Sequence, residues 1–200
     1  HTAKVKAALG DLPMPDNAWS LIFDPKYAAK LKSCGINYLD SASEVLPVAL
    51  HYIGKPAFSR EADDYKAAAE MLKKVRPYVT RFSSSGYIED MARGQVCAVM
   101  GYSGDINIAR ARALESKAKV KPDIVALVPS TGSTLFFDTM AIPKDAKNVE
   151  EAHLWINYIM RPEVHASLTN TVFYANPNAA SLKFVKKDVA DNKTIFLGDE

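Results

Sequence analysis

Cysteine is scarce in this sequence, since only Cys34 and Cys97 occur among its 200 residues. Neither cysteine belongs to a CxxC pair or has neighbouring histidines, so the pattern argues against a zinc site. Residue spacing leaves two alternatives open: two buried free thiols, or one disulfide in an exported protein.

The sequence also lacks an excess of charge of either sign. Its 25 basic and 23 acidic side chains give a formal net charge of +2, and they are spread along the chain. This distribution argues against a nucleic-acid-binding stripe and against an acidic tail.

Long apolar runs are missing as well. No run approaches the roughly 18 residues that a membrane helix needs. The first residues, HTAKVKAALGD, lack the apolar centre of a signal peptide, although a mature exported protein has already lost its signal. With 48% hydrophobic and 24% charged residues, the composition is that of a globular domain with a substantial core.

Apolar periodicity between about residues 25 and 160 alternates between short strands and amphipathic helices, a pattern typical of α/β domains. No internal linker or repeat interrupts it, so we expect one domain over residues 1–200. The less regular ends suggest a piece of a longer chain. The expected strands are residues 36–39, 96–100, 124–128 and 135–142.

Two helices have clear signals. Residues 62–79 carry acids at their start and bases at their end, which complements the helix dipole. The second helix should begin after Asn148, with Glu151 in its first turn, and stop at Arg161-Pro162. The apolar face of the first helix is expected to consist of Ala62, Tyr65, Ala69, Leu72 and Val75.

The motif GYSGD, after the apolar run VCAVM, permits three interpretations. A hydrolase would use Ser103 with Asp138 and either His153 or His165, in the chain order of α/β-hydrolases. The nucleophile motif of these hydrolases, GxSxG, requires glycine at its fifth position, where this chain has Asp105, so a hydrolase is disfavoured. A plain helix start is the second interpretation, because Ser103 or Asp105 would cap the following INIARARAL segment.

A ligand-binding turn is the third interpretation. Tyr102 with Asp105, Phe136 with Asp138, and Tyr174 form three aromatic loci, two of which carry acids. Aromatic faces and carboxylates together suit organic cations. An aspartate inside the apolar run LFFDTMAIP is costly to bury without a cationic partner, so Asp138 is expected to be the less hydrated acid. Ordinary core packing is the alternative for Phe136 and for Tyr174.

Several long segments, in the same order, resemble the second lobe of the periplasmic putrescine/spermidine-binding proteins of polyamine ABC importers. The resemblance runs from about Lys4 to Ala180 and is carried by KLKSCGINYLDSASEVLPVALHYIGK, SSGYIEDMARGQVCAVMGYSGD, LFFDTMAIP, WINYIMRPEV and VFYANPNAAS. It implies an α/β lobe of the type II periplasmic-binding-protein kind, with a mixed central sheet flanked by helices.

The resemblance also implies functional residues. At position 102 this chain has tyrosine where many family members have tryptophan. Tyrosine makes a weaker cation–π interaction, so the preferred polyamine stays open. Glu44 matches a family glutamate that reaches toward the ligand, although a first-turn helix acid explains it equally well. Cys34 and Cys97 match positions that are disulfide-linked in the family. The implied ligand-binding residues are Glu44, Tyr102, Asp105, Phe136, Asp138 and Tyr174.

These features imply a binding protein and not an enzyme, with no metal or other cofactor. The expected partners are a polyamine, the membrane permease of an ABC importer, and the first lobe of the same protein, which the sequence lacks. The expected compartment of this chain is the periplasm. An isolated lobe could also self-associate through its exposed face. A lobe for another ligand, such as a basic amino acid, is the alternative.

Overall fold

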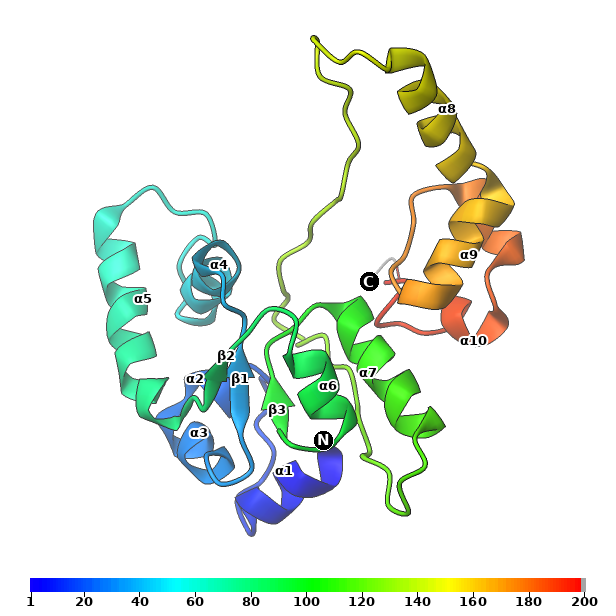
Figure 1. Cartoon of the computed structure of the whole chain (residues 1–200). Coiled ribbons are helices and arrows are strands. Elements are labelled where there is room, and N and C mark those ends of the chain that lie inside the picture. The colour runs from blue at the N-terminus through cyan, green and yellow to red at the C-terminus, as the bar shows by residue number, and fades with distance from the viewer. Residues whose placement is uncertain (199–200) are drawn as a thin grey trace. The chain divides into compact units, whose positions relative to one another are not determined.

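The chain divides into two compact units, His1–Thr134 and Leu135–Glu200. The computed structural model describes residues 1–198 (Figure 1). The single domain predicted for residues 1–200 stays a prediction. In order, the first unit contains α1 (Thr2–Leu9), α2 (Ser20–Phe23), α3 (Pro25–Leu31), β1 (Ile36–Tyr38), α4 (Ala42–Tyr52), α5 (Ala62–Val75), the 3₁₀ helix η1 (Arg76–Tyr78), β2 (Arg81–Phe82), α6 (Tyr87–Ala92), β3 (Ala98–Val99) and α7 (Ser103–Glu115). The second unit contains α8 (Val149–Ile159), α9 (Pro162–Val172), the 3₁₀ helix η2 (Ala179–Phe184) and α10 (Lys187–Ala190).

Three short strands form a parallel sheet in the first unit, in the order β2-β1-β3. Asn37, in the central strand, pairs with Arg81 of β2 on one side and with Val99 of β3 on the other. Parallel strands need crossover connections: α4 and α5 lie between β1 and its neighbour β2, and α6 lies in the connection from β2 to β3, which crosses β1 (Figure 1). The predicted α/β class is confirmed, but the sheet formed by the described residues is parallel and not mixed.

Two of the four predicted strands are present. The segment 36–39 contains β1, and the segment 96–100 contains β3. All three residues of β1 are buried, as expected for a central strand of a parallel sheet. The sequence did not predict β2, because its two residues are exposed and form no apolar run.

The other two predicted strands, residues 124–128 and 135–142, are wrong, since both segments are irregular in the structure. Ile124 is buried at 3% exposure, but most of the other large side chains lie in solvent: Leu127 is 57% exposed, Leu135 70% and Phe137 74%. An apolar run forms a strand only where a neighbouring strand satisfies its backbone N–H and C=O groups. Neither segment pairs with a strand within residues 1–198.

Both predicted helices form, as α5 and α8, with α5 giving way to η1 at Arg76. The buried side of α5 matches the predicted face only in part: Val75 is buried as predicted, but so is Ala68, which the prediction omitted, and Tyr65 is 37% exposed. Asn148 is the N-cap of α8 as predicted, but its side chain makes no capping hydrogen bond.

Aromatic side chains organise the core of the first unit. Phe23 packs edge-on against Tyr38, with ring centroids 5.7 Å apart, and packs also against Tyr52 at 5.3 Å. The Tyr38 hydroxyl donates to the carbonyl of Ile22 at 2.6 Å, which satisfies the buried phenol. Burial raises the pKa of Tyr38, because the phenolate would lose its hydration. No helix among the described residues is long and apolar enough to cross a membrane.

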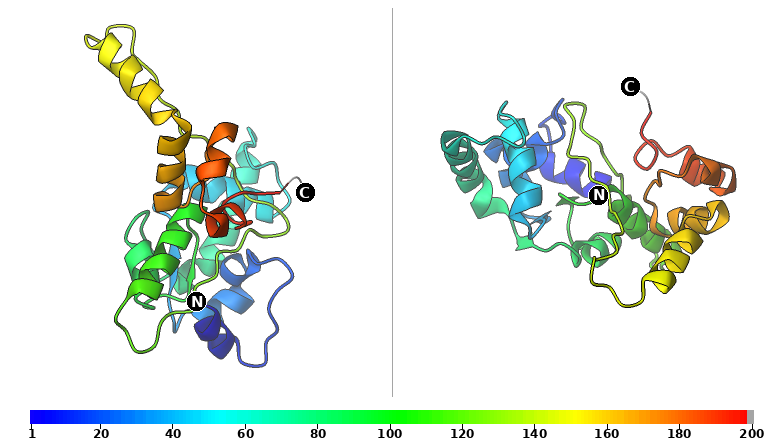
Figure 2. Two further views of the ribbon diagram at one scale, coloured as in Figure 1. Left: turned by 90° about the vertical axis from the view of Figure 1, so that its right-hand side faces the viewer. Right: turned by 90° about the horizontal axis from the view of Figure 1, so that it is seen from above.

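The second unit has a small core of its own, formed beside α9 (Figure 2). Its buried apolar side chains are Ala166, Val185, Val189 and Ile195. No residue of α8 is buried, although this helix carries large apolar side chains.

Cys34 and Cys97 form the disulfide that the resemblance implied, with a Cα–Cα distance of 5.5 Å. Cys34 precedes β1 and Cys97 precedes β3, and the Cys97 N–H donates to the carbonyl of Gly35 at 3.1 Å. The bond therefore joins the amino ends of two neighbouring strands.

Replacing Cys34 with Ser should lower the free energy of unfolding of the oxidised protein by roughly 4 kcal/mol, because the unfolded chain gains the freedom of a long loop. Denaturant titrations of both proteins, with and without reductant, measure this effect. After full reduction the two proteins should unfold together. An equal loss under both conditions would show that Cys34 acts through packing.

Candidate ligand-binding site

The carboxyl edge of the sheet is the natural place for a ligand in this topology. All three parallel strands end there, and in the strand order 2-1-3 the chain passes from β1 to β2 on one side and then crosses to β3 on the other side. In open α/β sheets ligands bind at such a switch point, which lies between β1 and β3 in this strand order. The segments that follow these two strands carry Glu44, Tyr102 and Asp105.

Glu44 lies in the first turn of α4, as its sequence position predicted, and it is half-buried. The helix begins after Ser41, whose backbone is extended and whose hydroxyl lies 3.0 Å from that of Ser43. A carboxylate in a first turn is favoured by the helix dipole, so this position has a structural benefit of its own.

Tyr102 and Asp105 belong to the start of α7. Tyr102 is the N-cap, with extended backbone, and Asp105 lies in the first turn; both are half-buried. Ser103 is the first helical residue, so GYSGD does begin a helix, as the second interpretation predicted. A helix start does not exclude ligand binding by the same residues. The peptide dipoles of α7 point their positive end at this turn, so an acidic side chain in this position stabilises the helix.

Sequence analysis missed Tyr87, the first residue of α6. This side chain is 0% exposed, and its hydroxyl donates to the Asp105 Oδ2 atom at 2.6 Å. The hydroxyl oxygen of Tyr87 in turn accepts a hydrogen bond from the backbone N–H of Tyr102 at 3.0 Å. A Cβ atom at Gly101 would lie 2.6 Å from the Tyr87 ring, so glycine permits this close approach. Nothing local to the segment SSGYIED indicates the contact.

The remaining predicted residues lie in the second unit. The rings of Phe136 and Tyr174 meet edge-on, with centroids 6.4 Å apart at an interplanar angle of 65°. Phe136 is 46% exposed and Tyr174 is half-buried, so neither is an ordinary core residue. Asp138 is exposed and lies in irregular chain. The expectation that Asp138 is the less hydrated acid, held inside a strand, is therefore wrong.

A hydrogen-bonded loop positions Tyr174. Helix α9 ends at Phe173, whose left-handed backbone (φ 58°) is uncommon for a bulky side chain. Beyond it, the Asn176 side chain donates to the hydroxyl of Thr169 and accepts from that of Ser181, both at 2.8 Å. Thr169 and Ser181 are both 2% exposed, so this short loop is anchored in the unit's own core.

The hydrolase interpretation gains nothing from the arrangement of these residues. Ser103 is an exposed first-turn residue of α7, without the sharp strained turn that presents a nucleophile. The Nδ1 atom of His153 lies 2.9 Å from the carbonyl of Val149 in its own helix. Among the described residues, no group of three or more His, Cys, Asp or Glu side chains is placed to hold a metal ion.

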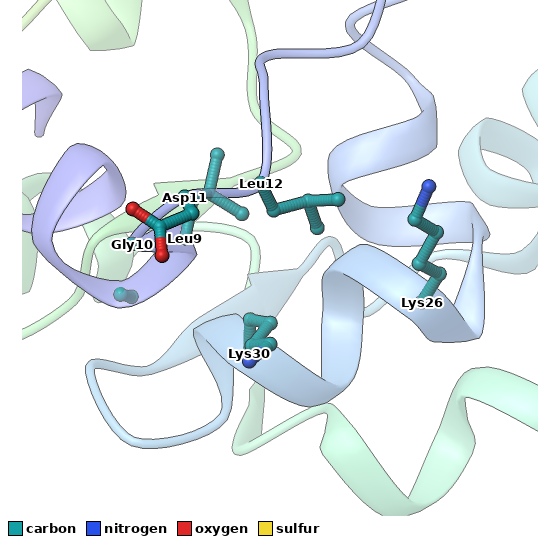
Figure 3. A pocket seen from close by; sticks show the side chains of 7 residues that line it. Leu9, Gly10, Asp11, Leu12, Lys26 and Lys30 are labelled. Carbon is teal, nitrogen blue, oxygen red and sulfur yellow. The ribbon is translucent and has the colours of Figure 1, made fainter.

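A surface cavity of about 550 Å³ lies elsewhere in the first unit, between the end of α1 and α3 (Figure 3). None of the predicted site residues lines it. Lys26 and Lys30 stand on one side of it and Asp11 on the other (Figure 3). Two ammonium groups would repel an organic polycation, so this cavity does not suit that class of ligand.

An α/β sheet with acids and an aromatic side chain at its carboxyl switch point defines a ligand-binding domain. The chain belongs to the bacterial extracellular solute-binding protein family, whose model matches residues 6–198. The predicted periplasmic-binding-protein-like fold is confirmed by solved structures: the putative spermidine/putrescine ABC transporter from Listeria monocytogenes superimposes with a TM-score of 0.78 at 30% identity. The match covers 97% of this chain and 55% of that one.

Curated relatives carry related names. The putrescine-binding periplasmic protein SpuD of Pseudomonas aeruginosa is 45% identical over 197 residues, which cover 98% of this chain and 53% of SpuD. The putrescine-binding periplasmic protein PotF of Escherichia coli is 43% identical over 194 residues, which cover 96% of this chain and 52% of PotF. The chain thus spans about half the length of the curated relatives it matches.

Proposed function

We propose that this chain is part of the substrate-binding component of a polyamine ABC importer, and that it binds putrescine or spermidine. The observation that carries the proposal is the placement of Tyr102 and Asp105 together at the start of α7, on the carboxyl edge of the sheet. The 45% identity to a protein named for putrescine binding supports the same ligand class.

The chemistry of these residues suits a flexible organic cation. Carboxylates of Glu44 and Asp105 would each pair with an ammonium group, and ordinary carboxyl groups are ionised at neutral pH. The ring of Tyr102 would cover part of the methylene chain, with about 0.5–2 kcal/mol more where the ring faces an ammonium. A net charge of +2 provides no overall attraction for a cation, so these local acids must supply it.

Binding without chemical conversion is the proposed activity. In two-lobe binding proteins a ligand held by one lobe is sealed by the other, and the permease recognises the closed form. We place this cycle in the periplasm, where a disulfide such as Cys34–Cys97 persists. SpuD and PotF are both named periplasmic proteins, which supports that compartment.

The missing partner of the second unit is, in this proposal, the part of the protein that the relatives have and this chain does not span. Helix α8 exposes large apolar side chains: Leu154 is 69% exposed, Trp155 59% and Tyr158 47%. Burying a side chain of this size contributes about 1.5–3 kcal/mol, so an exposed group of them marks an interaction surface. The same surface would favour self-association of the chain alone.

Replacing both Leu154 and Trp155 with Ser should reduce concentration-dependent association of the 200-residue chain, because the apolar area that drives it is removed. Sedimentation velocity over a range of protein concentrations measures the effect. Phe58→Ser is the matched control, since Phe58 is 76% exposed but belongs to the first unit. Association that persists in the double variant, or that Phe58→Ser abolishes, would contradict the role of α8.

A chain that carries only part of a polyamine site should bind the polyamine weakly. We expect putrescine to bind this chain no tighter than about 1 mM, and more weakly as salt is added, because exposed ion pairs are screened. Asp105→Asn should weaken binding about tenfold, whereas Asp138→Asn should cost threefold or less, because ion pairs with exposed carboxylates contribute roughly 0–1 kcal/mol. Calorimetric titration at high putrescine and spermidine concentrations measures these affinities.

Asp63→Asn provides the control for these charge changes, because Asp63 lies on the solvent side of α5 and pairs with Lys66 at 2.7 Å. Its affinity should equal that of the unmodified chain. A larger loss for Asp138→Asn than for Asp105→Asn would contradict the order inferred from hydration. Micromolar binding would show that this chain, or a second copy, supplies the whole site. Saturable binding of arginine without binding of polyamines would overturn the ligand class.

A further inference from the structure

The phenol oxygen of Tyr87 lies between two residues of the proposed site. It accepts a hydrogen bond from the backbone N–H of Tyr102 at 3.0 Å and donates one to the Oδ2 atom of Asp105 at 2.6 Å. Tyr87 itself is 0% exposed, so a ligand in solvent-accessible space would not contact it. One buried hydroxyl therefore joins the proposed aromatic and acidic contacts.

The positions of these residues in α7 give the contact a specific meaning. Tyr102 is the N-cap of the helix, and Asp105 is its third helical residue, after Ser103 and Gly104. An acid at this position commonly turns back to accept a hydrogen bond from the backbone N–H of the N-cap residue, in the arrangement called a capping box. Here the hydroxyl oxygen of Tyr87 accepts the hydrogen bond from that N–H, and the same hydroxyl donates a hydrogen bond to the Asp105 carboxylate.

The Tyr87 ring is fixed in place by packing. A Cβ atom at Gly101 would lie only 2.6 Å from its Cε2 atom, so the ring rests directly on the chain that leads into α7. Helices α6 and α7 also pack against each other (Figure 1). A side chain held on both sides keeps its hydroxyl at one point, which a water molecule at the same place would not do.

We propose that Tyr87 is a positioning residue for polyamine binding: its hydroxyl replaces Asp105 in capping α7 and so keeps the Asp105 carboxylate at the ligand edge of the sheet. This inference rests on the proposed function and deepens it. Without the hydroxyl, Asp105 can turn back to the Tyr102 N–H. The helix then stays capped, but the carboxylate is withdrawn from the ligand.

Tyr87→Phe tests this directly, because it removes the hydroxyl and keeps the ring. Putrescine binding should weaken about tenfold, as expected when a charged group loses a buried hydrogen bond that orients it. Tyr38→Phe is the matched control: Tyr38 is equally buried, and its hydroxyl donates to the Ile22 carbonyl at 2.6 Å. That variant should bind putrescine normally but should lose more thermal stability, since no other group replaces its hydrogen bond.

The combination with Asp105→Asn shows whether Tyr87 acts through Asp105. Tyr87→Phe should have no further effect on putrescine affinity in the Asp105→Asn protein. Multiplying losses, an unchanged affinity of Tyr87→Phe alone, or equal weakening by Tyr38→Phe would overturn the inference. If the unmodified chain shows no saturable putrescine or spermidine binding, the proposed function fails, and the inference with it. If the unmodified chain binds putrescine as expected and Tyr87→Phe leaves the affinity unchanged, only the inference about Tyr87 fails.

Discussion

Parallel pairing of β1 with both β2 and β3 is the constraint on which the candidate site depends. It brings the segments after β1 and β3 to one edge, where α4 and α7 begin and where Glu44 and Asp105 occupy first turns. At the opposite end of the same two strands, the bond between Cys34 and Cys97 joins their amino ends. The covalent link and the proposed ligand contacts thus act at the two ends of one strand pair.

Hydration ranks the two aspartates in the opposite order to the sequence prediction. Asp105 is half-buried, lies at a helix N-terminus and is held by the Tyr87 hydroxyl, whereas Asp138 is exposed in irregular chain. A carboxylate that is already partly desolvated and oriented loses less on meeting an ammonium group than one that must be ordered from solvent. Asp105, in the first unit, is therefore the better prepared acid. Within the second unit, Phe136 and Tyr174 form an edge-on aromatic pair.

The sequence predicted those features that depend only on residues close together in the chain. The helices α5 and α8 and the first-turn positions of Glu44 and Asp105 follow from periodicity and capping preferences. The segments 124–128 and 135–142 were mispredicted because a strand needs a partner, which no local pattern supplies. Tyr87 was missed for a similar reason: its hydroxyl meets a carboxylate 18 residues away only after α6 and α7 have packed. The disulfide came from family resemblance, since spacing alone left free thiols open.

The most direct test of the binding edge is a putrescine titration of the isotopically labelled chain, followed by amide NMR. Shifts that saturate with ligand should concentrate in residues 39–44 and 100–105, which follow β1 and β3. The cavity beside Lys26 and Lys30 should stay unperturbed. Saturable shifts confined to that cavity, or spread evenly over the surface in the manner of counterion screening, would contradict a polyamine site at the carboxyl edge of this sheet.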